Sequence, residues 1–204
     1  LDVCVYNRTE TKAFSWADEY DGLSAPTPAQ AAVDAQIVFL CVGNDSDVRA
    51  VTVETEGVLS TMTAGSLLVD HTTTSKTLAE ELHTACDELG ISFIDAPVSG
   101  GQAGAENGVL TVMAGGEASA FAVMKPVIAA YAKHTQRMGD AGSGQVTKMV
   151  NQLCIAGIQG GLSEAFHFAE CAGLDIDEVT RAIQGGAAQS WQMNNRAETM
   201  AQRK

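Results

Sequence analysis

Residues 37–48 read IVFLCVGNDSDV and contain the clearest fold signal in the chain. Ile37–Val42 is a continuous apolar run rich in β-branched and aromatic side chains, which is typical of a strand buried on both faces of a sheet. A polar turn follows, and then a segment near Asp47–Val53 that we expect to be helical. A strand, a short polar turn and a helix form the repeating unit of an α/β fold.

The same unit recurs along the first 140 residues. Leu67–Val69 is a second strand candidate, and the apolar residues of Ser75–Leu89 have near-helical spacing. Ile91–Ile94 returns to strand, and Leu1–Tyr6 with the helical segment Glu10–Tyr20 forms another unit ahead of residue 37. This alternation predicts a parallel sheet with helices on both faces.

The pattern changes beyond residue 98. A strand candidate at Val109–Met113 is followed by a glycine-rich hinge at residues 139–144. The rest is predicted to be helical, with a long apolar helix at about Gln145–Ala172 and a second helix at about Ile176–Gln184. We therefore expect a Rossmann-type domain over residues 1–141 and the first part of an all-helical domain over residues 142–204.

Composition and charge exclude several classes of function. The chain has 204 residues, and with 46% hydrophobic residues it can bury a sizeable core. Twelve basic and 25 acidic residues give a net charge of −13, which argues against nucleic acid or an anionic membrane as a partner. The longest stretch without a charged residue, Met149–Ser163, is too short and too amide-rich to span a bilayer. Five scattered cysteines without C-x-x-C spacing argue against a disulfide scaffold or zinc cluster and favour a reducing cytoplasm.

The ends of the chain are unusual. It opens at Leu1 inside a strand candidate and closes at Lys204 without a helix stop, so we expect a piece of a longer protein. The glycine fingerprint of a dinucleotide-binding fold should stand about 20 residues before Asn7, which places it ahead of Leu1. The one similar run, Gly142–Thr147, lacks the last glycine, and we interpret it as a helix entry.

Ligands of open parallel sheets bind beyond the carboxyl ends of the strands, so the polar residues there are site candidates. After the first strand come Asn7, Arg8 and Thr9, where a dinucleotide fold usually carries an acid for the adenosine ribose. A guanidinium at this place suits a 2′-phosphate and favours NADP over NAD. The alternative is a polar turn in which Thr9 caps the next helix. The polar residues after the next two strands, 43–47 and 70–75, fit either ligand contacts or ordinary turns.

Ser99, Gly100 and Gly101 follow the strand that ends near Ile94. Paired glycines after a serine let consecutive N–H groups converge on an anion, with a hydroxyl alongside. The bend therefore fits the carboxylate of a substrate.

Lys148 stands about one turn into the long helix, and Asn151 and Gln152 follow it at i+3 and i+4, on the same helical face. That face is otherwise apolar, so the lysine loses solvation and its pKa falls toward the range in which it exchanges a proton near neutrality. The alternative is a lysine that snorkels at a helix end.

Three motifs occur in order: Asn7-Arg8-Thr9, DAPVSGG at Asp95–Gly101 and GSGQVTKMVNQ at Gly142–Gln152. With them the sequence resembles the β-hydroxyacid dehydrogenases, which include 3-hydroxyisobutyrate dehydrogenase and 2-hydroxy-3-oxopropionate reductase. The resemblance covers essentially the whole chain. It implies an NAD(P)-binding domain joined by one long helix to an all-helical domain that forms a homodimer or homotetramer.

The resemblance also implies roles for single residues. Ser99, Gly100 and Gly101 would hold the substrate carboxylate, and Lys148 would be the general acid/base. Asn151-Gln152 stands where the usual pair is Asn-Asn, which leaves the exact substrate open. The remaining candidates are cofactor contacts at Asn7, Arg8, Thr9, Val42, Gly43, Asp47 and Thr73, and Trp191, which is either a pocket-lining aromatic or plain helix packing.

We therefore expect an oxidoreductase that transfers a hydride between NADP or NAD and a small 3-hydroxy acid or its semialdehyde. The alternative is a catalytically silent family member that acts as an oligomeric binding module. A short-chain dehydrogenase is excluded because Tyr6, Tyr20 and Tyr131 have no lysine four residues on. Metal hydrolysis is disfavoured, since the four histidines form no ligand pair such as H-E-x-x-H.

Overall fold

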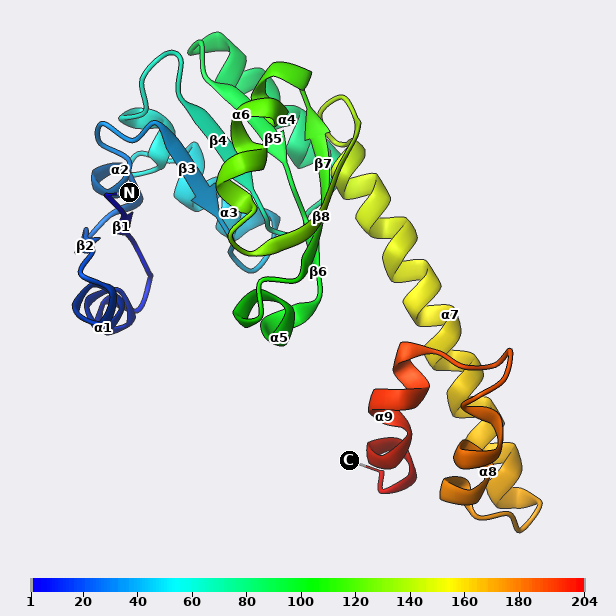
Figure 1. Cartoon of the computed structure of the whole chain (residues 1–204). Helices are drawn as coiled ribbons and strands as arrows, with labels where there is room; N and C mark the ends of the chain where they lie inside the picture. Colours follow the sequence, from blue (N-terminus) through cyan, green and yellow to red (C-terminus); the bar gives the residue numbers. More distant parts are fainter. Residues whose placement is uncertain (1, 204) are drawn as a thin grey trace. The chain divides into compact units, whose positions relative to one another are not determined.

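The computed structural model describes residues 2–203. The chain divides into two compact units, Leu1–Lys148 and Met149–Lys204. Figure 1 shows both, coloured along the sequence.

The sheet of the first unit contains strands β3 (Ile37–Leu40), β4 (Leu67–Asp70), β5 (Ser92–Asp95), β6 (Val98–Ser99), β7 (Leu110–Gly116) and β8 (Ala132–Gly139). Their order is β3-β4-β5-β7-β6, with β8 also paired to β7. β3, β4 and β5 are parallel, so Leu40, Asp70 and Asp95 end the three strands side by side. β7 is antiparallel to β5 and β6 and parallel to β8.

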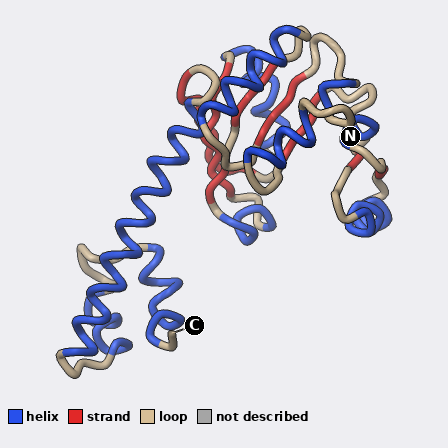
Figure 2. The backbone as a smooth tube through the Cα atoms, turned by 180° about the vertical axis from the view of Figure 1, so that it is seen from behind, coloured by secondary structure: helices blue, strands red, loops and turns tan. Residues whose placement is uncertain are grey.

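Helices cover both faces of this sheet (Figure 2). They are α3 (Asp45–Thr52) and α4 (Lys76–Glu88) on one face and α6 (Ala118–Ile128) on the other. Leu68 lies in the core cluster that includes α4, whereas its neighbour Val69 lies in the cluster that includes α6. Since successive side chains of one strand enter two different cores, the strands have continuous apolar sequences instead of alternating ones.

The remaining elements of the first unit are short. β1 (Cys4–Val5) and β2 (Leu23–Ser24) form a separate two-stranded parallel sheet, and α1 (Glu10–Tyr20) connects them. The others are α2 (Pro28–Ala31), the 3-10 helix η1 (Val58–Ser60) and α5 (Gly101–Glu106).

The second unit is helical. It contains the greater part of α7 (Ser143–Cys171), together with α8 (Ile176–Ile183) and α9 (Trp191–Ala201). Its core consists of Leu162, Phe166, Ala169, Ile176, Met193 and Ala197. Across residues 2–203, no helix has both the length and the apolar character that a membrane crossing requires.

The predicted fold class, a Rossmann-type sheet followed by a helical region, is confirmed, and α1 has the predicted bounds. The sheet is mixed because β7 turns back between β5 and β6. β8 and α5 were not predicted. β8 (AKHTQRMG) has no fully buried residue, and α5 contains two glycines, so neither shows a strong apolar period.

Candidate active site

The loops after β3 and β4 are bonded to each other at the carboxyl edge of the sheet. The Asp45 carboxylate accepts hydrogen bonds from the backbone N–H of Ser75 at 3.0 Å and from its hydroxyl at 2.5 Å. The backbone N–H of Val42 donates to the Thr72 hydroxyl oxygen at 3.0 Å. Predicted cofactor contacts from two separate motifs, Val42 and Thr73, are thus brought to one edge.

Gly43 lies in the turn that starts α3, next to the Asp47 side chain. Asn44 caps the helix by accepting from the Asp47 N–H at 3.0 Å, and a Cβ added at Gly43 would overlap the Asp47 carboxylate. The turn therefore exposes backbone, with Asp47 held alongside.

Arg8 lies close to this turn. Its guanidinium is 3.7 Å from the Asp47 carboxylate, and its side chain is 88% exposed. Asn7 accepts a hydrogen bond from the Thr9 N–H at 2.8 Å. Thr9 is the N-cap residue of α1, as the alternative predicted, although its side chain makes no capping bond. The structure brings Asn7, Arg8 and Thr9 to the same edge as Gly43 and Asp47.

Ser99 ends β6, and the next two residues start α5 in backbone conformations that favour glycine. Gly100 has φ 132° and Gly101 has φ 62°. A Cβ at Gly100 would lie 2.9 Å from the Leu110 side chain. Glycine is therefore favoured at both positions of the bend, where other residues would be strained.

Asp95 connects the end of β5 to the start of α7. Its side chain is fully buried, and it accepts hydrogen bonds from the N–H groups of Gly142 at 2.7 Å and Gln145 at 2.8 Å. Burial raises the pKa of Asp95 to about 6, although both hydrogen bonds act in the opposite direction. A carboxylate at this place satisfies helix N–H groups that have no partner within the helix.

Gly144 permits this close approach. A Cβ at Gly144 would lie 2.5 Å from the Met113 carbonyl oxygen and 2.6 Å from the Asp95 carbonyl oxygen. The first turn of α7 is thus seated directly on the backbone of β5 and β7.

Lys148 follows one helical turn later. Lys148 as a whole is 9% exposed, and its Nζ donates a hydrogen bond to the Val98 carbonyl oxygen at 2.8 Å. Burial lowers the pKa of Lys148 below its ordinary value. Val98 directly precedes Ser99, so the structure brings the predicted acid/base and the predicted carboxylate bend together.

His71 is the histidine closest in sequence to the predicted cofactor contacts, and both of its ring nitrogens are hydrogen-bonded. Nδ1 donates to the Ala96 carbonyl oxygen at 2.6 Å, which leaves Nε2 to accept from the Tyr131 hydroxyl at 2.7 Å. Burial lowers the pKa of His71 and so favours the neutral ring. His71 therefore supports the fold and is a poor candidate for the acid/base.

The other predicted substrate residues belong to the second unit. The Asn151 side-chain amide donates to the Gln152 side-chain oxygen at 2.9 Å. Trp191 starts α9, is 61% exposed, and has the Arg196 guanidinium 5.7 Å from its ring centre.

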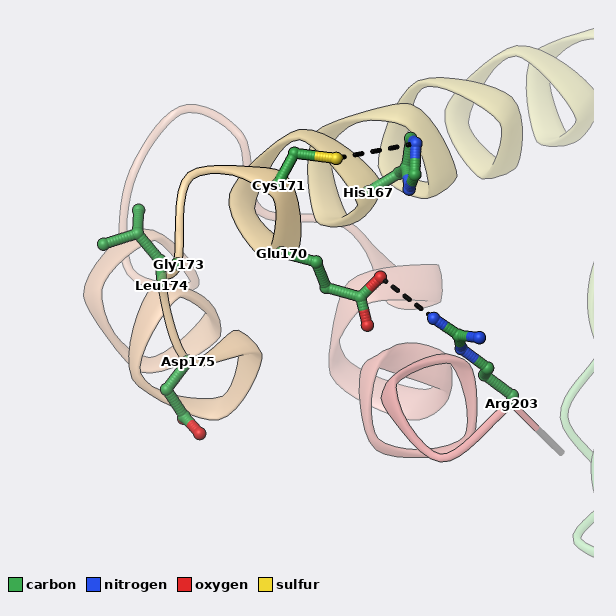
Figure 3. A pocket seen from close by; sticks show the side chains of 7 residues that line it. All are labelled: His167, Glu170, Cys171, Gly173, Leu174, Asp175 and Arg203. Atoms are coloured by element: carbon green, nitrogen blue, oxygen red, sulfur yellow. Dashed lines mark hydrogen bonds and ion pairs between the residues drawn. The ribbon is translucent and has the colours of Figure 1, made fainter.

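A surface depression in the second unit contains none of the predicted site residues. In it the Cys171 Sγ lies 3.7 Å from the His167 Nε2, and Arg203 pairs with Glu170 (Figure 3). No group of three or more His, Cys, Asp or Glu side chains is arranged to hold a metal ion anywhere in residues 2–203.

Sequence reasoning did not assign several residues that organise this edge. They are buried polar residues at strand or helix ends: Asp70, Thr72, Thr74 and Gln145. The signal available was their position, because a polar residue directly after a buried strand needs a partner. Asp70 accepts from the Thr72 N–H two residues on. The Thr72 hydroxyl and the Gln145 amide have partners 30 to 73 positions away, which the sequence did not identify.

The edge suits the nicotinamide dinucleotide that the resemblance implies. Ribose, phosphate and amide groups could be contacted here by three features. They are the backbone at Gly43, which has no side chain, the exposed Arg8 guanidinium and the polar residues after β4. Asn7, Arg8, Thr9, Val42, Gly43, Asp47 and Thr73 are the residues that would hold it.

Comparison with known families identifies both parts of the chain. Residues 1–142 match the NAD binding domain of 6-phosphogluconate dehydrogenase. Residues 142–204 match the family described as NAD-binding of NADP-dependent 3-hydroxyisobutyrate dehydrogenase.

Curated relatives agree. The chain is 55% identical over 201 residues to an uncharacterized oxidoreductase of Shewanella frigidimarina, covering 98% of this chain and 69% of the relative. It is 40% identical over 189 residues to a probable mitochondrial 3-hydroxyisobutyrate dehydrogenase-like protein of Arabidopsis thaliana, covering 92% and 56%. It is 33% identical over 181 residues to the 2-hydroxy-3-oxopropionate reductase of Escherichia coli, covering 89% and 62%. The chain thus spans between 56% and 69% of the length of these three relatives.

Solved structures have the same fold. A 3-hydroxyisobutyrate dehydrogenase from Salmonella typhimurium superposes with a TM-score of 0.84 at 31% identity, covering 99% of this chain and 70% of that one. The Mycobacterium tuberculosis 3-hydroxyisobutyrate dehydrogenase solved with L-serine gives 0.81 at 29% identity, covering 93% and 64%.

Proposed function

Because the chain belongs to the β-hydroxyacid dehydrogenase family, whose cofactor is NAD or NADP, we propose that its protein oxidises a small 3-hydroxy acid or reduces the corresponding semialdehyde. In this proposal residues 1–141 form the NAD(P)-binding domain, and residues 142–204 belong to the domain for substrate binding and oligomerisation. The nicotinamide supplies the redox chemistry by accepting or donating a hydride.

One observation carries the proposal. Lys148 is 9% exposed as a residue, and its amine is partly buried and lies 2.8 Å from the Val98 carbonyl oxygen, beside the Ser99–Gly101 bend. A buried amine with a lowered pKa suits general acid/base work, because its neutral and charged forms both become accessible nearer to neutral pH.

The proposed roles follow from this placement. Ser99, Gly100 and Gly101 bind the substrate carboxylate with a hydroxyl and backbone N–H groups. As the alcohol carbon loses its hydride, the hydroxyl proton passes to the Lys148 amine and a carbonyl forms. In the reverse direction Lys148 returns that proton to the carbonyl oxygen. Asn151 and Gln152, three and four residues further along α7, orient this oxygen with their amides.

We assign the cofactor preference to NADP on the basis of Arg8. An exposed guanidinium 3.7 Å from Asp47, at the edge that holds the other predicted contacts, suits a 2′-phosphate. NAD is the alternative cofactor.

The substrate assignment is supported by the relatives. Their printed names include 3-hydroxyisobutyrate dehydrogenase-like proteins, a 2-hydroxy-3-oxopropionate reductase and an L-serine dehydrogenase. All three names refer to short substrates with oxygen on the carbon β to a carboxylate. By the family resemblance we propose Trp191, which is 61% exposed, as a pocket-lining aromatic, with plain helix packing as the alternative.

A homodimer or homotetramer is supported by apolar residues of α7 that are exposed within the second unit. Val150 is 56%, Leu153 73% and Phe168 74% exposed. Such residues on one helix favour burial against further protein, which another copy or the part of its relatives that this chain does not span can supply. Light scattering of the purified protein measures the state directly.

The proposal is tested by following NADPH and NADH absorbance over a panel of short 3-hydroxy acids and semialdehydes. We expect turnover with at least one three- or four-carbon member. We expect none with the corresponding methyl ester, because the ester has no carboxylate anion for the Ser99–Gly101 bend to bind. No turnover across the panel, with cofactor still bound, would favour the silent binding module instead.

A further inference from the structure

We infer that Gln145 is a positioning residue that holds the Thr73 cofactor loop at a set place relative to Lys148. The inference rests on the function proposed above, and it is carried by an arrangement of hydrogen bonds that is independent of that function.

The Gln145 side-chain amide pairs with the backbone on both sides of Thr73. Its Nε2 donates to the Thr72 carbonyl oxygen at 2.7 Å, and its Oε1 accepts from the Thr74 N–H at 3.0 Å. The planar Gln145 amide thus forms the two backbone hydrogen bonds that a neighbouring strand would form if the sheet continued beyond the end of β4. Thr73 lies between the two bonds and is itself exposed.

These bonds are protected from water. Gln145 is fully buried, Thr72 is 2% exposed and Thr74 is 7% exposed. Buried hydrogen bonds are costly to break because the freed groups find no water partner. The loop that contains Thr73 is therefore held in one conformation.

Gln145 is itself held from a third direction. Its backbone N–H donates to the Asp95 carboxylate at 2.8 Å, and Asp95 also accepts from the Gly142 N–H at 2.7 Å. Backbone and side chain of one residue thus connect the ends of β4 and β5 to the first turn of α7.

Lys148 is three residues after Gln145 and lies on the same side of α7. Rotation or sliding of this turn would move the Lys148 amine away from the Val98 carbonyl and would break the Thr72 and Thr74 bonds as well. The distance between the proposed cofactor contact at Thr73 and the acid/base at Lys148 is therefore set through Gln145. Hydride transfer is sensitive to such placement, since misplacement by about 1 Å costs on the order of 100-fold in rate.

The test compares Gln145→Met with Thr147→Val in the whole protein. Methionine has nearly the length of glutamine but can form neither bond. Thr147 is two residues further along, and its hydroxyl bonds only to the Ser143 carbonyl oxygen within α7, at 2.7 Å. Gln145→Asn, whose amide is too short to reach both partners, is the second variant in case the methionine disturbs folding. Thermal unfolding confirms that each variant is folded.

The first measurement is hydrogen exchange of the Thr74 amide, which needs no cofactor or substrate. We expect exchange to accelerate about tenfold or more in both Gln145 variants, as loss of a buried hydrogen bond implies, and to stay unchanged in Thr147→Val. Unchanged exchange in the Gln145 variants overturns the inference.

The second measurement is steady-state kinetics. We expect kcat to fall about tenfold or more in the Gln145 variants, with the KM for the hydroxy acid unchanged because Ser99–Gly101 is untouched. Equal kcat in Gln145→Met and Thr147→Val overturns the positioning role. If the unmodified protein turns over no 3-hydroxy acid, the proposed function fails, whereas Thr74 exchange still decides whether Gln145 holds the loop.

Discussion

The Nζ of Lys148 donates a hydrogen bond to the carbonyl oxygen of Val98 at 2.8 Å, across 50 positions of the sequence. The contact holds the amine at the end of β6, against the residue that directly precedes Ser99. It also supplies a neutral acceptor in place of an anion, so the amine is desolvated without gaining a counter-charge there. Burial then lowers the pKa of Lys148, the direction that acid/base work near neutral pH requires.

Replacement of Lys148 by alanine should reduce turnover about 10²–10⁴-fold, the usual contribution of a general acid/base. In the direction of alcohol oxidation the amine must be neutral, so the wild-type rate should rise with pH through the lowered pKa of Lys148. The variant should lose this limb of the pH–rate profile. Initial rates over a pH series measure both effects, and an unaltered profile would refute the assignment.

Arg8→Ala should lower the preference for NADP over NAD by about tenfold or more, as loss of a charge-assisted bond to phosphate implies. Arg49→Ala is the matched control, because the Arg49 guanidinium is paired with Glu81 at 2.7 Å. The ratio of kcat/KM for the two cofactors should not change in the control. An unchanged ratio in Arg8→Ala would assign the 2′-phosphate contact elsewhere.

Gly144→Ala should destabilise the first unit severely. The added methyl group would meet the Met113 and Asp95 carbonyl oxygens at 2.5 and 2.6 Å, and backbone cannot move aside as a side chain can. Gly157→Ala is the control in the same helix, since a Cβ there meets nothing within 4 Å. We expect the control to gain about 0.5–1 kcal/mol from helix propensity. Denaturant unfolding compares the two, and equal stabilities would contradict the close seating of α7.

Asp95→Asn should destabilise the fold by about 1–3 kcal/mol. Asparagine has one acceptor oxygen for the two N–H groups of Gly142 and Gln145, so one donor stays buried without a partner. Asp70→Asn is the matched control, because the Thr72 N–H donates to one Asp70 oxygen that asparagine retains. Similar unfolding free energies for the two variants at pH 7 would contradict the capping role of Asp95.

The pH dependence of stability follows from Asp70. Burial raises the pKa of Asp70 in the folded state to about 6, above its ordinary value of 3.8. Between these values the folded state binds more protons than the unfolded state, so this group favours folding as pH falls from 7 to 4. Relative to Asp70→Asn, the unmodified protein should gain at most about 3 kcal/mol over that range. Unfolding free energies of both proteins at several pH values measure it, and parallel curves would exclude the raised pKa.

Much of the fold was predictable because buried segments have recognisable patterns of apolar residues in the sequence. The runs at Ile37–Val42 and Leu67–Val69 indicated strands covered on both faces, and the cores on the two sides of β4 show why. β8 escaped prediction because it has no fully buried residue, and the return of β7 between β5 and β6 has no local signal.

The sequence by itself determined the α/β order, the family motifs and the presence of Lys148 on an apolar helical face, since these depend on residues close together in the chain. Only the tertiary structure decided that Asp95 caps α7, that Gln145 grips the Thr73 loop, and that Lys148 reaches Val98. Those hydrogen bonds join residues 47 to 73 positions apart. These pairings depend on the order of the strands in the sheet and on the glycines that let a helix approach the sheet closely. The local periodicity of the sequence contains neither kind of information.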